Sequence, residues 1–130
     1  MKKADEILAF RRKAEARGRR SEWLAIALLV CKAYRILGRR VRTRAGEIDL
    51  IALSPRGILC FVEVKARGDA LSAALSLSDK QKARIGRAAR LYLAQRQELA
   101  RRDVRFDVIA IAPATLPRHY RDAWRDDTTR

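Results

Sequence analysis

Residues 46–65, GEIDLIALSPRGILCFVEVK, constrain the fold of this chain more than any other stretch. Short runs of Val, Ile, Leu and Phe bounded by Gly and Pro predict two strands joined by a tight turn. Both faces of both strands are largely apolar, which is typical of strands that are covered on both sides. We therefore expect these strands to lie inside a sheet rather than on its surface.

Four charged residues interrupt the two strands: Glu47 and Asp49 in the first, Glu63 and Lys65 in the second. Burying a lone charge is very costly, so such charges must be paired, bind a metal or line a cleft. Side chains alternate between faces along a strand, so the two charges of each strand share a face.

The turn decides whether the two charged pairs meet. We expect Asp49 to lie opposite Glu63. Ser54 then lies opposite Ile58, and residues 55–57, Pro-Arg-Gly, form a three-residue loop. This loop length is common and favours Gly last, in the left-handed region, while Pro suits the first position. The register predicts a patch of three carboxylates and one ammonium, which a two-residue loop would break.

An acidic residue on one strand, followed by Glu-x-Lys on the next, resembles the PD-(D/E)xK nuclease signature. The wider order is GEIDLIA, then FVEVKAR, a basic helix ending in RAARLYLA, and RFDVIAIAP. That order is similar to the bacterial YraN family. The resemblance covers residues 18–124 and implies the restriction-endonuclease-like fold.

The resemblance also implies a metal-dependent nuclease site. In such a site Asp49 and Glu63 hold Mg²⁺, or Mn²⁺ in its place, through oxygen ligands. Lys65 positions the attacking water or neutralises the scissile phosphate. Glu47 and Glu22 are accessory ligands or orienting residues, and no organic cofactor is expected.

Residues 21–33 are predicted to form a helix with Ser21 as its cap and Glu22 in its first turn. The resemblance implies that Glu22 reaches the metal cleft, as the helix glutamate does in related resolvases. The residues alone favour equally an acidic side chain stabilised by the dipole at a helix N-terminus. Both interpretations stay open at this point.

The chain carries 30 Lys and Arg against 15 Asp and Glu in 130 residues, a net charge of +15. Such an excess indicates an anionic partner, with nucleic acid first and DNA favoured over RNA. An Arg-rich solvated surface is the alternative, but the charge clusters in segments. The residues expected to contact phosphates are Arg39, Arg40, Arg42, Arg44, Lys80, Lys82, Arg84 and Arg87.

A second helix begins at Ser78, because Ser78 and Gln81 form a capping box. Gln81 is therefore interpreted as a capping residue rather than a functional one. A strand follows at residues 104–112, after which Pro113 and Pro117 are expected to end regular structure. His119 is expected at the surface, and the tail is expected to pack on the core through Trp124.

The two cysteines, Cys31 and Cys60, show no Cys-x-x-Cys spacing, so buried free thiols in a reducing cytoplasm are expected rather than structural zinc. No apolar run suits a signal peptide, and residues 24–30 are too short to cross a bilayer. We therefore expect a cytoplasmic protein that does not engage a membrane. The sequence leaves a homodimer open.

Taken together, these patterns predict one α/β domain: a helix, a three-stranded antiparallel meander, a long basic helix and a further strand. We expect a basic arm or helix at 1–20, a nuclease-like core at 21–112 and a tail at 113–130. The predicted function is nucleic-acid binding with metal-dependent endonuclease activity on branched or structured DNA. The alternatives are a non-catalytic nucleic-acid-binding module, and an adaptor on RNA or protein whose four charges form an internal ion network.

Overall fold

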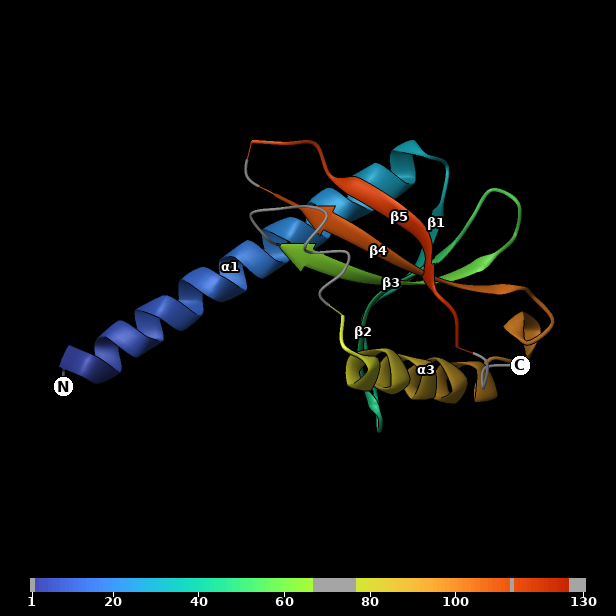
Figure 1. Ribbon diagram of the computed structural model, residues 1–130, viewed down its shortest axis with the longest axis horizontal. Helices are drawn as coiled ribbons and strands as arrows, with labels where there is room; N and C mark the ends of the chain where they lie inside the picture. Colours follow the sequence, from blue (N-terminus) through green and yellow to red (C-terminus); the bar gives the residue numbers. More distant parts are fainter. Residues whose placement is uncertain (1, 67–76, 113, 127–130) are drawn as a thin grey trace.

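The computed structural model describes residues 2–66, 77–112 and 114–126, and these form a five-stranded mixed sheet with helices packed on it (Figure 1). The elements are α1 (Lys2–Cys31), β1 (Arg35–Thr43), β2 (Gly46–Leu53), β3 (Leu59–Ala66), α3 (Asp79–Ala94), the 3₁₀ turn η1 (Gln97–Leu99), β4 (Val104–Ile111) and β5 (Arg118–Trp124). The strands stand in the order β1-β2-β3-β4-β5. β3 and β4 are parallel, and the other neighbours are antiparallel. The predicted α/β architecture is confirmed.

Two separate apolar clusters cover the sheet. One joins Ile85 of α3 to Phe61 of β3, and the other joins Leu29 of α1 to Val62 of β3. Phe61 and Val62 are neighbours in sequence and point to opposite faces, as the pleat of a strand requires. The two helices therefore bury the two faces of β3, which explains why its sequence is apolar throughout.

The hairpin of β2 and β3 has the predicted register. Leu50 pairs with Val62, which makes Asp49 and Glu63 the next residues in line towards the open end of the hairpin. At the closed end, Gly57 has a φ of +86°, the left-handed conformation that a three-residue loop needs at its last position. The turn chemistry therefore sets the pairing that brings the two acids together.

Helix α3 begins as predicted. The Gln81 N–H donates to Ser78 Oγ at 3.1 Å, and the Ser78 N–H donates to Gln81 Oε1 at 3.0 Å. This capping box satisfies donors at the helix N-terminus. Ile85 and Tyr92 then bury one face of α3 against the sheet.

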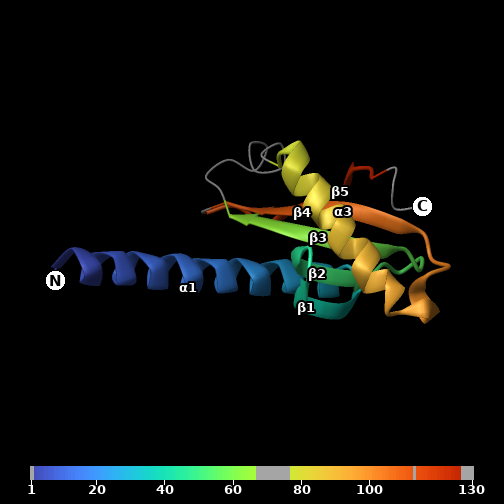
Figure 2. The ribbon, with the colours of Figure 1, turned by 90° about the horizontal axis from the view of Figure 1, so that it is seen from below.

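Of the two alternatives for residues 1–20, an arm or a helix, the structure has the helix, and α1 continues into the helix predicted at residues 21–33. It runs for 30 residues through Gly18, and its N-terminal half extends beyond the sheet (Figures 1 and 2). Ser21 is therefore not a cap, and Glu22 lies about five turns into the helix. The helix-dipole interpretation of Glu22 is wrong, because the dipole's effect is confined to the first turn.

Strand β5 replaces the irregular structure that the sequence predicts after Pro117. It pairs antiparallel with β4, and the Trp124 ring stacks on Phe106 with centroids 5.2 Å apart. The predicted packing of Trp124 is confirmed. His119 was expected at the surface, but its side chain is only 3% exposed, because it binds the buried carboxylate of Asp107.

The predictions for the two cysteines have different outcomes. Cys60 is buried as expected, whereas Cys31 is exposed. Most of the segment between β3 and α3, residues 67–76, lies outside the described residues. None of the helices in the described part of the chain is both long enough and apolar enough to span a bilayer.

Replacing Trp124 with Ala should lower the free energy of unfolding by about 3–5 kcal/mol, because it removes a buried ring and leaves a cavity beside Phe106. Urea denaturation measures this change. Leu116→Ala is the matched control, since Leu116 is 86% exposed, and it should stay within about 0.5 kcal/mol of wild type. A Trp124→Ala protein as stable as the control would contradict the packing of β5 on the core.

Candidate functional site

Asp49 and Glu63 face each other across β2 and β3 and share a side-chain hydrogen bond. The Val64 N–H donates to Asp49 Oδ2 at 2.8 Å, which fixes the Asp49 carboxyl group against β3. Glu63 is buried, with 8% of its surface exposed. The structure therefore brings the two principal predicted site residues into direct contact.

The pKa values of this carboxyl pair are displaced upward. Burial raises the pKa of Glu63 to about 8, and the adjacent Asp49 adds to the shift, while Lys65 and Arg84 oppose it. Burial also raises the pKa of Asp49, against the hydrogen bonds from Val64 and Glu63 that favour its charged form. Two carboxyl groups held together away from water keep a proton between them near neutral pH. A bound cation would take the place of that proton.

Lys65 and Arg84 supply positive charge from two different elements. Lys65 lies two residues after Glu63 on β3, and its charge acts on both carboxyl groups. Arg84 reaches across from α3, where its Nη1 donates to the Glu47 carbonyl at 3.2 Å. Two of the predicted phosphate-contact residues, Arg84 and Arg42, therefore lie against Glu47 near the start of β2.

Glu22 reaches the site from α1 and is held there by Arg40. The Arg40 Nε lies 2.7 Å and 3.0 Å from the two Glu22 carboxylate oxygens, and Glu22 is only 8% exposed. This hydrogen bond is the main reason that the pKa of Arg40 is raised, and the charges of Glu47 and Asp49 raise it further. The negative charge of Glu22 also raises the pKa of Asp49.

Arg40 has an unusual backbone for a residue within a strand. Its φ is +50°, in the left-handed region that costs free energy for a residue with a side chain. It stands opposite Asp49 in the pairing of β1 with β2. Because such strain persists only when its surroundings enforce it, it marks this part of β1 as a functional candidate.

The site offers a metal ion two carboxylates, Asp49 and Glu63, rather than three. Among the described residues, no group of three or more His, Cys, Asp and Glu side chains is placed to hold one ion. Glu22 pairs with Arg40, and Glu47 lies 3.6 Å from Arg42. A site with two carboxylates suits Mg²⁺, which keeps several of its waters when it binds to protein.

The remaining predicted basic residues lie on elements that flank β2. Arg39 stacks its guanidinium over Trp23, 4.7 Å from the ring centroid, and Arg42 is 89% exposed. The side chains of residues 10–18 lie outside the description, so of the arginines in the predicted basic arm only Arg19 and Arg20 have described side chains, and both are exposed. Exposed to solvent beside the site are Arg39, Arg42, Arg44, Lys80 and Arg87, with Lys82 and Arg84 partly buried.

Sequence reasoning missed a second polar cluster, which surrounds Asp107 of β4. Burial alone would raise the pKa of Asp107, but hydrogen bonds from His119, Arg105 and the Asp122 N–H outweigh it and lower that pKa. The Arg105 Nε and Nη2 both donate to the carboxylate at 2.8 Å. One sequence feature could have indicated this cluster: Arg105 and Asp107 are two residues apart, so they share a face of a strand that is otherwise apolar.

Comparisons with known proteins match the whole of the carboxylate site. The profile of the uncharacterised protein family UPF0102 matches residues 21–111. A UPF0102 protein of Maricaulis maris is 50% identical over 115 residues, which cover 88% of this chain and 89% of that protein. Relatives from Rhizobium johnstonii, 46% identical over 119 residues (92% and 97%), and Mesorhizobium japonicum, 45% over 122 residues (93% and 96%), match in the same way.

The stability of the metal-free protein should fall as the pH rises from about 5 to 8. An unfolded Glu loses its proton near pH ~4.3, whereas folded Glu63 keeps one until pH about 8. The folded state therefore binds more protons in this window, so its stability declines with pH. Thermal unfolding in EDTA across this range measures the slope.

The variant Glu63→Gln should flatten that slope and should be more stable than wild type at pH 8, by an amount on the order of a few kcal/mol. Asp107 does not contribute to the slope between pH 5 and 8, because its pKa is lowered and it exchanges its proton only in more acidic solution. Glu98→Gln, on the exposed turn η1, is the control and should keep the wild-type slope. A wild-type protein with equal stability at pH 5 and pH 8 would contradict the buried carboxyl pair.

Proposed function

Because this chain belongs to the YraN family, the uncharacterised protein family UPF0102, and pairs two buried carboxyl groups beside a lysine, we propose that it is a metal-dependent nuclease. The observation that carries the proposal is the contact between Asp49 and Glu63. Two adjacent carboxyl groups whose pKa values are both raised form a site that a divalent ion would stabilise. The substrate class that we propose is nucleic acid, with structured or branched DNA ahead of RNA.

Mg²⁺ or Mn²⁺ would be held by Asp49 and Glu63, and the ion would stabilise charge on the phosphate and acidify a water molecule. Lys65 contributes a donor that carries no acceptor, so it suits a phosphate oxygen or the attacking water. Arg40 fixes the carboxylate of Glu22 next to Asp49, which makes Glu22 an orienting residue. Arg84 steadies the end of β2 through the Glu47 carbonyl.

Nucleic-acid binding in this proposal uses the exposed cations on either side of β2. β1 carries Arg42, the turn after it carries Arg44, and α3 carries Lys80 and Arg87. Contacts from such side chains to phosphates fix the position of the strand without reading its sequence. The net charge of +15 supports attraction over a longer range, which raises association rates at low salt.

A non-catalytic nucleic-acid-binding module is the second candidate. It is favoured by the pairing of Glu22 with Arg40 and of Glu47 with Arg42, which leaves two carboxyl groups instead of three or four for a metal. In that case the four site charges would serve the fold as an internal ion network. Metal binding and cleavage, measured on the same variants, separate the two candidates.

Asp49→Asn and Glu63→Gln should each abolish Mn²⁺ binding and reduce cleavage by at least about 100-fold, because each removes an anionic oxygen from the ion. Binding of DNA in EDTA should be unchanged or tighter, since each change lowers repulsion of phosphate. Lys65→Gln should keep Mn²⁺ binding but lose about 100-fold in cleavage. Calorimetry with Mn²⁺ and cleavage of linear, flapped and branched DNA measure these effects.

The control is Glu98→Gln, which removes one exposed carboxylate on η1 and should match wild type in every assay. Thermal unfolding of each variant confirms that the protein is folded. A folded wild-type protein that binds neither Mg²⁺ nor Mn²⁺ and cuts none of the three substrates would leave the non-catalytic module as the better conclusion.

The double variant Arg42→Ala/Arg44→Ala should weaken binding to all DNA sequences alike. If both arginines contact phosphates, the slope of log affinity against log salt should shrink by about 2. Fluorescence anisotropy between low and moderate salt measures this slope. The charge-matched control is Arg101→Ala/Arg118→Ala, two exposed arginines outside the site. An equal loss in both double variants would contradict a specific role for the end of β1 and the turn that follows it.

A further inference from the structure

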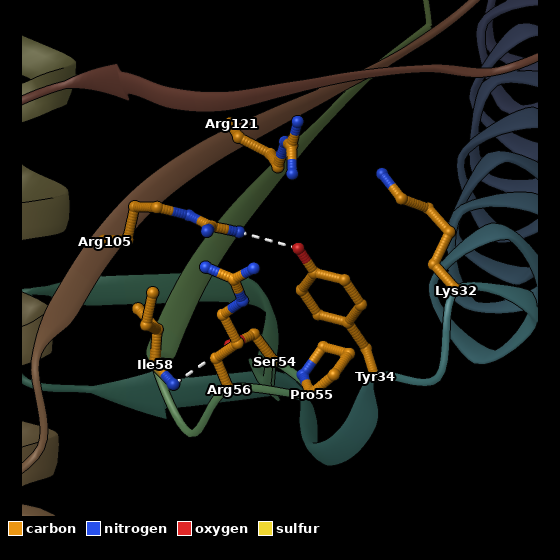
Figure 3. A pocket seen from close by; sticks show the side chains of 8 residues that line it. All are labelled: Lys32, Tyr34, Ser54, Pro55, Arg56, Ile58, Arg105 and Arg121. Atoms are coloured by element: carbon orange, nitrogen blue, oxygen red, sulfur yellow. Dashed lines mark hydrogen bonds between the residues drawn. The ribbon is translucent and has the colours of Figure 1, made fainter.

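A pocket of about 200 Å³ lies beside the turn between β2 and β3 (Figure 3). Ser54 and Ile58, at the closed end of the hairpin, contribute to its wall. A strand rises ~3.3 Å per residue, so this end of β2 is roughly 16 Å from Asp49. The pocket is therefore separate from the carboxyl pair.

Positive charge converges on this pocket from four parts of the chain. The described residues that line it include four cations, two hydroxyl groups and no acid. Figure 3 shows the cationic side chains turned towards one another across the pocket. These side chains are Lys32 after α1, Arg56 in the turn, Arg105 on β4 and Arg121 on β5.

The nearby carboxylate of Asp107 pairs with only one of the four cations, Arg105. Its oxygens accept two hydrogen bonds from Arg105, one from the His119 ring and one from a backbone N–H. Lys32 Nζ lies 2.6 Å from the other nitrogen of His119, Nδ1. Among the described residues, Lys32, Arg56 and Arg121 form no salt bridge, so three cations face the pocket without an acidic partner.

This like charge is an unfavourable arrangement for the protein alone. Cations brought close together repel. Because Lys32, Arg56 and Arg121 are exposed, solvent reduces this repulsion but does not remove it. Burial lowers the pKa of Lys32, and the charge of Arg121 lowers it further. An anion in the pocket would relieve the repulsion, which is how the fold can keep these side chains together.

The two hydroxyl groups are arranged to donate. The Tyr34 hydroxyl oxygen accepts from Arg105 Nη2 at 2.8 Å, and Ser54 Oγ accepts from the Ile58 N–H at 3.0 Å. A hydroxyl that already accepts still has a hydrogen to donate. Tyr34 and Ser54 are 8% and 7% exposed, so their positions are set by packing before any ligand arrives.

We propose that this pocket binds a phosphate monoester, the dianionic group that ends a nucleic-acid strand or a nucleotide. A monoester carries a charge of about −1.5 to −2 at neutral pH and three strong acceptor oxygens. Arg guanidinium groups match such oxygens in paired hydrogen bonds. At ~30 Å³ per water the pocket holds roughly six waters, which leaves room for a phosphate and part of a sugar.

Binding of internally labelled DNA in EDTA tests this inference without any cleavage. Three strands of one sequence are compared, with a 5′-phosphate, a 3′-phosphate or hydroxyl groups at both ends, each beside AMP and inorganic phosphate as competitors. Wild type should prefer a phosphorylated end by roughly tenfold or more, because charge-assisted hydrogen bonds are the strong ones. Arg56→Gln/Arg121→Gln should remove the preference, while the control Arg101→Gln/Arg118→Gln should keep it.

The outcomes separate the two sources of the phosphate. If AMP competes for binding but the protein does not distinguish among the three strands, the pocket binds a free nucleotide. If the protein prefers a phosphorylated strand and AMP does not abolish that preference, the pocket binds the end of a strand. Folded wild type that shows no preference and binds neither AMP nor phosphate overturns the inference, as does a preference that survives Arg56→Gln/Arg121→Gln. If the protein cleaves DNA with Mn²⁺ but shows no preference for a phosphorylated end, the result counts against the phosphate pocket alone. If it prefers a phosphorylated end but cleaves no DNA, the result counts against the nuclease proposal alone.

Discussion

The pairing register of β2 and β3 is the constraint on which the candidate site depends. Side chains alternate along a strand, so a slip of one residue would put Asp49 and Glu63 on opposite faces. The turn prevents that slip, because Gly57 takes a φ of +86° and the Ser54 N–H donates to the Ile58 carbonyl at 2.9 Å. The loop at residues 55–57 therefore places the two acids in contact, although it lies at the other end of the hairpin. Burial of β3 between α1 and α3 then keeps the contact away from water and raises the pKa of Glu63.

The site destabilises the fold, and the destabilising features lie close together in space. The carboxyl pair is destabilised by burial and mutual repulsion, and Arg40 holds a left-handed backbone opposite Asp49. The sheet tolerates this because its centre is well packed: Phe61, Phe106 and Trp124 form a continuous stack beneath α3. A buried carboxyl pair and a left-handed residue within a strand are unfavourable features, and their concentration in one place of an otherwise well-packed fold is typical of a functional site.

Much of this arrangement could be predicted from the sequence, and the exceptions have physical causes. The hairpin and α3 follow from local chemistry, namely a loop ending in Gly and a Ser–Gln capping box, so pattern and structure agree. β5 could not be predicted, because it is an edge strand whose burial comes from partners on β4, and its residues do not alternate. The convergence of Asp49 and Glu63 followed from alternation and loop length. The pairing of Glu22 with Arg40 did not, since it depends on how α1 packs and on one left-handed residue in β1.

The two buried acidic centres of this fold show why one of them suits a cation and the other does not. Asp107 is completely buried, yet its pKa is lowered, because Arg105, His119 and a backbone N–H supply donors to its oxygens. Its charge is already compensated, so it serves to attach β5 to β4. Glu63 is also buried, with 8% of its surface exposed, but its side-chain hydrogen bond joins it to another carboxyl group, and its pKa is raised to about 8. A buried acid whose charge the protein leaves uncompensated is the one that a divalent ion would stabilise, which places the proposed chemistry at the open end of the β2–β3 hairpin.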